Sequence, residues 1–168
     1  MAFAALLVVL AAVGCGSSQD GAAPAGTATV ERVVDGDTVA VRLAGGRRER
    51  VRLLGIDTPE SVKPHTPVQC FAKEASSRLA SLLPRASSVR LVRDVEERDR
   101  YGRLLAYLYR QPDGLFVNLD MARGGYAQLL TYPPNVAHVE ELQRAVREAR
   151  DARRGLWGSC PAAASLRP

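Results

Sequence analysis

Three short runs rich in β-branched residues, separated by glycine-containing pairs, follow one another early in the chain. Residues 29–34 and 37–43 flank Asp35-Gly36, a pair favoured in tight hairpin turns, and Gly45-Gly46 separates the second run from residues 50–56. Turns this short join antiparallel neighbours, whereas parallel strands need a long crossover. These runs therefore predict a three-stranded meander.

The pattern changes after the meander. Apolar residues recur at helical spacing over 69–83, where Pro84 ends the predicted helix, and residues 89–92 and 104–109 return to the strand pattern. Two more helices are predicted, a short one over 117–123 and a longer one along the apolar stripe Val139, Leu142, Val146 and Ala149. The charged face of this last helix is interpreted as a solvated surface.

Five short strands with one helix after the third predict an α+β protein, a β-barrel with helices. The expected architecture is a five-stranded Greek-key barrel of the OB type with three α-helices. We expect this domain to cover residues 29–160, with no internal repeat and no second domain. OB barrels offer one face and its loops to nucleic acids or sugars, but the fold alone does not determine function.

The N-terminus is interpreted as an export signal. Residues 1–13 are apolar and uncharged, but they are shorter than the roughly 20 residues that a membrane-spanning helix needs. Gly14-Cys15 follows, and a cysteine after small residues at this place resembles a bacterial lipobox, in which Cys15 would be lipidated. A plain secretory signal is the alternative, because no basic residue precedes the apolar run. Both alternatives take the protein out of the cytoplasm.

The composition of the two ends differs from that of the predicted domain. With residues 1–15 assigned to the signal, residues 16–28 are rich in Gly, Ser, Ala and Pro and are expected to form a flexible tether. Residues 161–168 are expected to be a disordered tail. Cys70 and Cys160 remain as an even pair in an oxidising compartment, which predicts a disulfide, with two separate thiols as the alternative.

Three carboxylates are expected to meet at one end of the barrel. Asp37 starts one strand, and Asp57 and Glu60 follow the end of its antiparallel neighbour. Carboxylates this close need a cation such as Ca²⁺ or Mg²⁺, and Thr58, held extended by the following proline, can add its carbonyl. Strict alternation would turn Asp57 to the opposite face, so the hypothesis requires a bend at Gly55.

The stretch "DRYGRLLAYLY", residues 99–109, places Arg100, Tyr101 and Arg103 at the mouth of a strand. Two guanidinium groups there can clamp a phosphate, and a tyrosine can stack on a base. Taken alone, the stretch can also be a turn and a strand with solvated arginines.

Three motifs together resemble one family. "VDGDTV", "VRLLGIDTPE" and "DRYGRLLAYLY" occur in the order and with the separations typical of the thermonuclease, or staphylococcal nuclease, family, and the final "RGLWGSCP" is similar to the end of its exported bacterial members. The resemblance covers about residues 29–160. It implies an OB barrel with three helices and a Ca²⁺-dependent endonuclease, with one Ca²⁺ per chain, that cleaves DNA and RNA and leaves 3′-phosphate ends.

The resemblance also implies roles for individual residues. Asp37, Asp57 and the main-chain carbonyl of Thr58 would bind the metal, and Glu60 would orient or deprotonate the attacking water. Arg52 and Arg103 would hold the charged transition state. The substrate would be bound by Arg100, Tyr101 and Tyr132, while Leu130 stands about where the family has a second tyrosine.

The formal charge of +5 suits an anionic partner, although only Lys63 and Lys73 among the 23 basic residues are lysines, a bias that a GC-rich genome also produces. DNA and RNA are the expected partners of a monomer, with membrane contact only through a lipid on Cys15. The alternative function is a non-catalytic OB module that binds nucleic acid. Such a module has no use for three acids kept together with Arg52 and Arg103, so the sequence favours the enzyme.

Overall fold

The computed structural model describes residues 26–61 and 67–160 of the 168-residue chain. Five strands close a barrel in the order β1-β2-β3-β6-β5, in which only β3 and β6 are parallel. Their bounds are β1 Gly26–Asp35, β2 Thr38–Leu43, β3 Arg48–Leu53, β5 Ser88–Val92 and β6 Leu104–Arg110. The predicted five-stranded barrel is confirmed; the signal, most of the tether and the tail lie outside the described residues.

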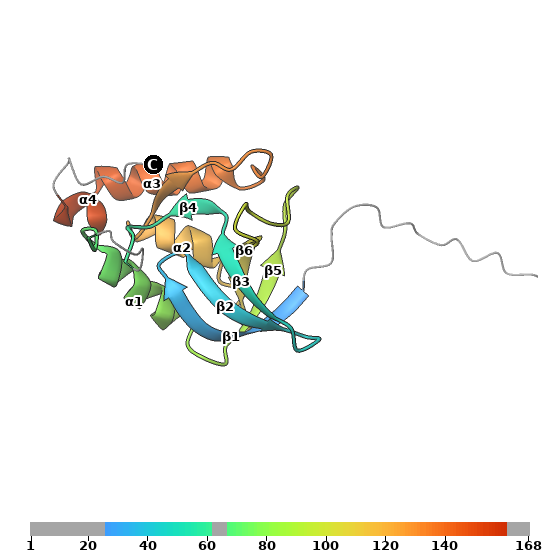
Figure 1. Ribbon diagram of the computed structural model, residues 1–168. Coiled ribbons are helices and arrows are strands. Elements are labelled where there is room, and N and C mark those ends of the chain that lie inside the picture. The colour runs from blue at the N-terminus through green and yellow to red at the C-terminus, as the bar shows by residue number, and fades with distance from the viewer. Residues whose placement is uncertain (1–25, 62–66, 161–168) are drawn as a thin grey trace, which may run out of the picture.

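Three helices pack on one side and one end of the barrel, and their number is as predicted: α1 Ala72–Leu82, α2 Val117–Arg123 and α3 Val139–Asp151. The single turn α4 Leu156–Ser159, which was not predicted, follows them. In Figure 1, α1 lies beside β1 and α3 runs across the end of the barrel where β4 lies. The prediction started α1 at residue 69, three residues too early. Phe71 has a left-handed backbone with φ 68°, so the helix begins only after it.

The chain bends sharply at Gly55, as the placement of Asp57 required. Gly55 has φ +77°, and a Cβ there would lie 2.3 Å from Leu142 Cδ1, so both the backbone angle and the contact with α3 demand glycine. The third strand, predicted to run to residue 56, ends at Leu53. The short strand β4 (Gly55–Asp57) leaves the barrel and pairs with β7 (Gln128–Leu130).

The first hairpin turn lies one residue later than predicted. Asp35 is the last residue of β1 and faces Thr38, so the two turn residues are Gly36 and Asp37. A Cβ on Gly36 would lie 2.7 Å from Thr58 Oγ1. The glycine thus lets the turn pack directly against the segment that follows β4.

The domain also begins earlier than predicted. Residues 26–28, assigned to the tether, belong to β1, where Gly26 faces Leu91 and Ala28 faces Val89 of β5. Ala28 is buried in the core, so these residues help to close the barrel. Within the described part of the chain, no helix is long and apolar enough to cross a membrane.

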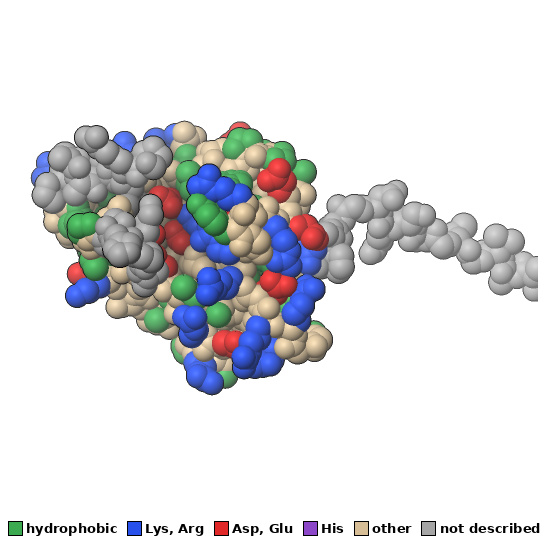
Figure 2. Space-filling model, in the orientation of Figure 1, with side chains coloured by type: hydrophobic (Ala, Val, Ile, Leu, Met, Phe, Trp, Pro, Cys, Tyr) green, Lys and Arg blue, Asp and Glu red, His purple; other side chains and the backbone are tan. Residues whose placement is uncertain are grey.

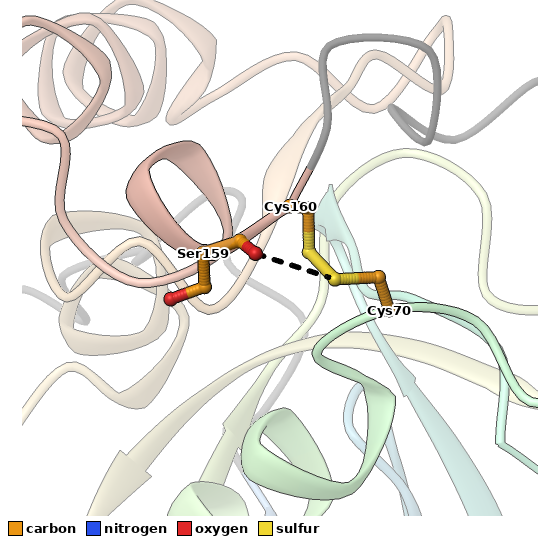
Figure 3. The surroundings of a disulfide bond; sticks show 3 residues. All are labelled: Cys70, Ser159 and Cys160. Carbon is orange, nitrogen blue, oxygen red and sulfur yellow. Dashed lines mark hydrogen bonds between the residues drawn. A yellow bond between two sulfur atoms is a disulfide. The ribbon is translucent and has the colours of Figure 1, made fainter.

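Cys70 and Cys160 form a disulfide with a Cα–Cα distance of 5.9 Å, which confirms the predicted pairing. Cys70 lies just before α1, and Cys160 follows α4 (Figure 3). The sulfur of Cys70 also lies 3.9 Å from the carbonyl oxygen of Ser159. The bond therefore joins the start of α1 to the C-terminal end of the described chain.

Candidate active site

Arg52 links two of the predicted metal ligands. Its Nη2 atom lies 2.7 Å from Asp57 Oδ1 and 3.1 Å from Asp37 Oδ2. Its Nη1 atom donates to the carbonyl oxygens of Leu53 and Ile56 at 2.9 and 2.8 Å, on either side of the bend at Gly55. The guanidinium is almost fully buried, and both of its Nη atoms are held by these contacts, so its position beside the carboxylates is fixed.

Thr58 contacts Asp37, one of the two aspartates that Arg52 binds. Its main-chain N and its hydroxyl donate to Asp37 Oδ2 at 3.1 and 3.2 Å, and both residues are buried. The structure thus brings together the three residues expected to hold a metal. The close packing of Gly36 on Thr58 explains how a hairpin turn and the end of a distant strand meet here.

The electrostatic environment of Asp57 favours a nearby cation. Burial raises the pKa of its carboxyl group most strongly; Arg52 lowers this pKa, and the charge of Asp37 raises it again. The net direction of this pKa shift is upward, so Arg52 does not fully offset the cost of ionising the buried Asp57 carboxyl group. A second positive charge at the two carboxylates would do so.

The sequence predicts a cluster of three carboxylates, and the structure differs from this prediction. Among residues 26–61 and 67–160, no three Asp, Glu, His or Cys side chains lie close enough to hold a metal ion. The expected meeting of three carboxylates is therefore corrected to the aspartate pair that Arg52 joins, while Glu60 keeps the separate water-orienting role that the resemblance implies. Two carboxylates beside a threonine still fit a hard cation whose other ligands are carbonyl and water oxygens.

Arg103 is held by a residue to which the sequence assigned no role. Its Nε atom donates to Asp99 Oδ2 at 2.6 Å, and Asp99 Oδ1 accepts the main-chain N–H groups of Tyr101 and Arg103 at 2.9 and 3.0 Å. Asp99 is buried, and Gly102 at φ +76° completes this tight turn. Arg103 also lies 3.5 Å from Thr38 Oγ1, which places it next to the aspartates.

Two adjoining clefts contain the remaining predicted residues. A cleft of about 250 Å³ is lined by both arginines, 52 and 103, together with Arg100, Tyr101, Leu130 and Tyr132. Arg100 donates to the hydroxyl of Tyr101 at 2.7 Å, and Tyr101 is 68% exposed, so its ring is available to a ligand. Leu130 lines the cleft at the place where the family has a second tyrosine, so Tyr132 has no aromatic neighbour from its own loop and the other aromatic ring of the cleft is that of Tyr101.

Glu60 lines the second cleft, of about 580 Å³, together with Tyr101 and Arg103. Its main-chain N donates to Gln69 Oε1 at 2.7 Å, and its carbonyl accepts from Gln69 N at 3.0 Å. The predicted water-orienting acid thus shares a cleft with one predicted transition-state arginine. The two clefts meet at Tyr101 and Arg103.

Asp35, Asp99 and Gln69 support the site but were not predicted. Asp35 Oδ1 accepts from Gly36 N, Ser61 Oγ and Ser76 Oγ at 2.8, 2.6 and 3.1 Å. The acid pair in "DGD" could have indicated Asp35, but the Asp-Gly pair was interpreted as the turn itself. Asp99 stands within a quoted motif, whereas no sequence signal connects Gln69 to Glu60.

Residues 50–159 match the family model described as Staphylococcal nuclease homologue. A thermonuclease of Staphylococcus hyicus is 39% identical over 133 residues, covering 79% of this chain and 76% of the relative. A thermonuclease of Staphylococcus intermedius is 43% identical over 128 residues, covering 76% of this chain and 74% of the relative. Endonuclease YncB of Bacillus subtilis is 35% identical over 131 residues, covering 77% of this chain and 60% of the relative.

Proposed function

This chain belongs to the staphylococcal nuclease family and is a nuclease, and from that premise we propose that it is an exported, Ca²⁺-dependent endonuclease. Its substrates are DNA and RNA, cleaved with little sequence specificity to leave 3′-phosphate ends. Low specificity is expected because contacts to phosphate carry no base information.

The observation that carries this proposal is the placement of Arg52 between Asp37 and Asp57, at the edge of a cleft that also contains Arg103. Two aspartates repel a phosphodiester unless a cation lies with them, so a module that only binds nucleic acid gains nothing from them. The alternative, a non-catalytic OB module, leaves this pair without a purpose.

Asp37, Asp57 and the main-chain carbonyl of Thr58 would hold Ca²⁺, one ion per chain. When bound, the ion would polarise a phosphoryl oxygen of the substrate. Arg52 and Arg103, each fixed by hydrogen bonds before substrate arrives, would donate to the oxygens whose charge grows in the transition state.

Glu60 would orient the attacking water or accept its proton, since it opens into the cleft that Arg103 shares. Arg100 and Tyr101 would bind the terminal phosphate of the substrate, and Tyr132 would contact the nucleotide. Arg100 and Tyr132 line only the first cleft and Glu60 only the second, so the scissile phosphate would sit where the two clefts meet, at Tyr101 and Arg103.

Export rests on residues 1–15, with lipidation of Cys15 or plain secretion as the two routes. We propose a monomer that contacts a membrane only through a lipid on Cys15. The disulfide supports export, because such bonds persist in oxidising compartments.

The test is to incubate the purified protein with single-stranded DNA and with RNA, in Ca²⁺ and in a chelator. Cleavage in Ca²⁺ alone, with ends that a phosphatase must treat before 3′ extension, supports the full proposal. Equal cleavage in chelator contradicts the metal, and binding without cleavage favours the OB module.

A further inference from the structure

The cleft that contains Glu60 extends beyond the catalytic residues. Its other walls are Arg48, Glu49 and Arg50 of β3. Neither Arg48 nor Arg50 has a role in the proposed chemistry, although both line the same cleft as Glu60 and Arg103.

These arginines form a row with the catalytic ones. Arg48, Arg50 and Arg52 alternate along β3 and therefore point to one side of it, about 6.6 Å apart from one to the next. Arg52 is buried at the aspartates, whereas Arg48 and Arg50 are exposed. Val51 faces Leu104 in the parallel pairing of β3 and β6, and Arg50 and Arg103, which precede these two residues, line the same cleft.

The row keeps a net positive charge. Arg50 forms no hydrogen bond or ion pair with any residue of the described chain. The Nε atom of Arg48 lies 3.0 Å from Glu31 Oε1, and Arg42 is paired with the same carboxylate. One negative charge therefore faces two guanidinium groups. Glu49, the one acid of this wall, is already paired with Arg47 and Arg98. Figure 2 shows Lys and Arg side chains gathered over the face that β2 and β3 form.

We propose that Arg50 and Arg48 form an extended subsite for the sugar-phosphate backbone of a single-stranded polynucleotide, beyond the scissile phosphate and away from the cleft of Arg100 and Tyr132. The spacing of alternate residues on a strand is comparable to that of successive phosphates in an extended nucleic acid strand, and an unpaired guanidinium binds phosphate without reading the base. This inference rests on the proposed nuclease function. It makes the enzyme prefer chains of several nucleotides over a dinucleotide.

The test compares the double variant Arg48→Ala/Arg50→Ala with the matched control Arg144→Ala/Arg147→Ala, which removes the same charge from the exposed face of α3. The values of kcat/KM are measured on an oligonucleotide of about 12 nucleotides, within the range that an OB site covers, and on a dinucleotide. We expect the first variant to lose at least about tenfold more activity on the oligonucleotide than on the dinucleotide. Its salt dependence should become shallower by about 1.4 in log–log slope, the value for two lost contacts on a single strand.

The conservative variant Arg48→Lys/Arg50→Lys, which keeps the charge, should recover most of the loss on the oligonucleotide. Equal losses on both substrates, or the same loss in the control variant, would overturn the subsite. If the wild-type protein cleaves neither substrate, the proposed function fails separately. The subsite is then tested by fluorescence anisotropy with the same oligonucleotide in chelator, where unchanged affinity of the Arg48→Ala/Arg50→Ala variant contradicts it.

Discussion

Glu60 and Gln69 hold each other through two hydrogen bonds in opposite directions. The main-chain N of Glu60 donates to the side-chain oxygen of Gln69 at 2.7 Å, and the main-chain N of Gln69 donates to the carbonyl of Glu60 at 3.0 Å. Gln69 immediately precedes Cys70, which is bonded to Cys160. The main chain of the proposed water-orienting acid is thus held by a residue nine positions later, which the neighbouring disulfide links to Cys160.

Gln69→Ala should therefore lower kcat by about tenfold or more while KM changes little, because a small displacement of a positioned acid is costly and substrate contacts remain. Gln69→Glu keeps an oxygen that accepts the Glu60 N–H and should recover most of kcat. Steady-state kinetics on DNA measures both. Gln143→Ala, an exposed glutamine of α3, is the control. A rise in KM with kcat unchanged would contradict the positioning role.

Arg52→Ala should reduce kcat by about 10² or more and also destabilise the fold. The loss of one fixed donor to the transition state accounts for the first effect. The second effect is expected because Arg52 ties together both sides of the Gly55 bend. Removing it leaves Asp37 and Asp57 without their partner, which costs about 3 kcal/mol.

Chemical denaturation in chelator measures the stability change of Arg52→Ala. Arg103→Ala is the matched comparison, because Arg103 is less buried and its partner Asp99 keeps two main-chain N–H donors when the guanidinium is lost. We expect a similar loss of kcat in both variants but a clearly smaller stability change for Arg103→Ala. Equal stability losses would show that Arg52 does not brace the bend.

Asp99→Ala should reduce activity nearly as much as Arg103→Ala, because Asp99 accepts from both the side chain and the main chain of Arg103. The two residues act as one unit, so the double variant should be little worse than either single variant. A double-mutant cycle on kcat/KM tests this coupling. Fully additive losses would mean that Asp99 acts through the turn alone and does not position the guanidinium.

The repeating patterns of the sequence were sufficient for the barrel and the main helices, because periods of two and 3.6 residues are properties of short segments. The bend at Gly55 was also predictable, since alternation alone would have turned Asp57 away. In contrast, β4 and β7 have three residues each, too few to show a period.

The unpredicted parts of the site depend on contacts between distant segments. Gly36 is needed because Thr58 and Ala75 pack against it, a contact that no local pattern reveals. The local sequence at Asp35 indicates only a turn, whereas its side chain accepts hydrogen bonds from Ser61 and Ser76 across the fold. The residues that carry chemistry were recognisable by type and order, whereas those that position them were recognisable only in three dimensions.

Replacing both cysteines, in Cys70→Ser/Cys160→Ser, should lower the free energy of unfolding by up to about 4–5 kcal/mol, since the bond closes a loop across 90 positions. Urea denaturation of the oxidised wild-type protein and this variant gives the difference. Activity should fall as well, even at temperatures where the variant remains folded. The reason is that the disulfide holds Cys70, and its neighbour Gln69 positions Glu60. Mass spectrometry of exported protein, alkylated without reductant, checks the bond itself. Finding both cysteines alkylated would disprove the disulfide, and a destabilised variant with full kcat would show that the bond stabilises the fold without supporting Glu60.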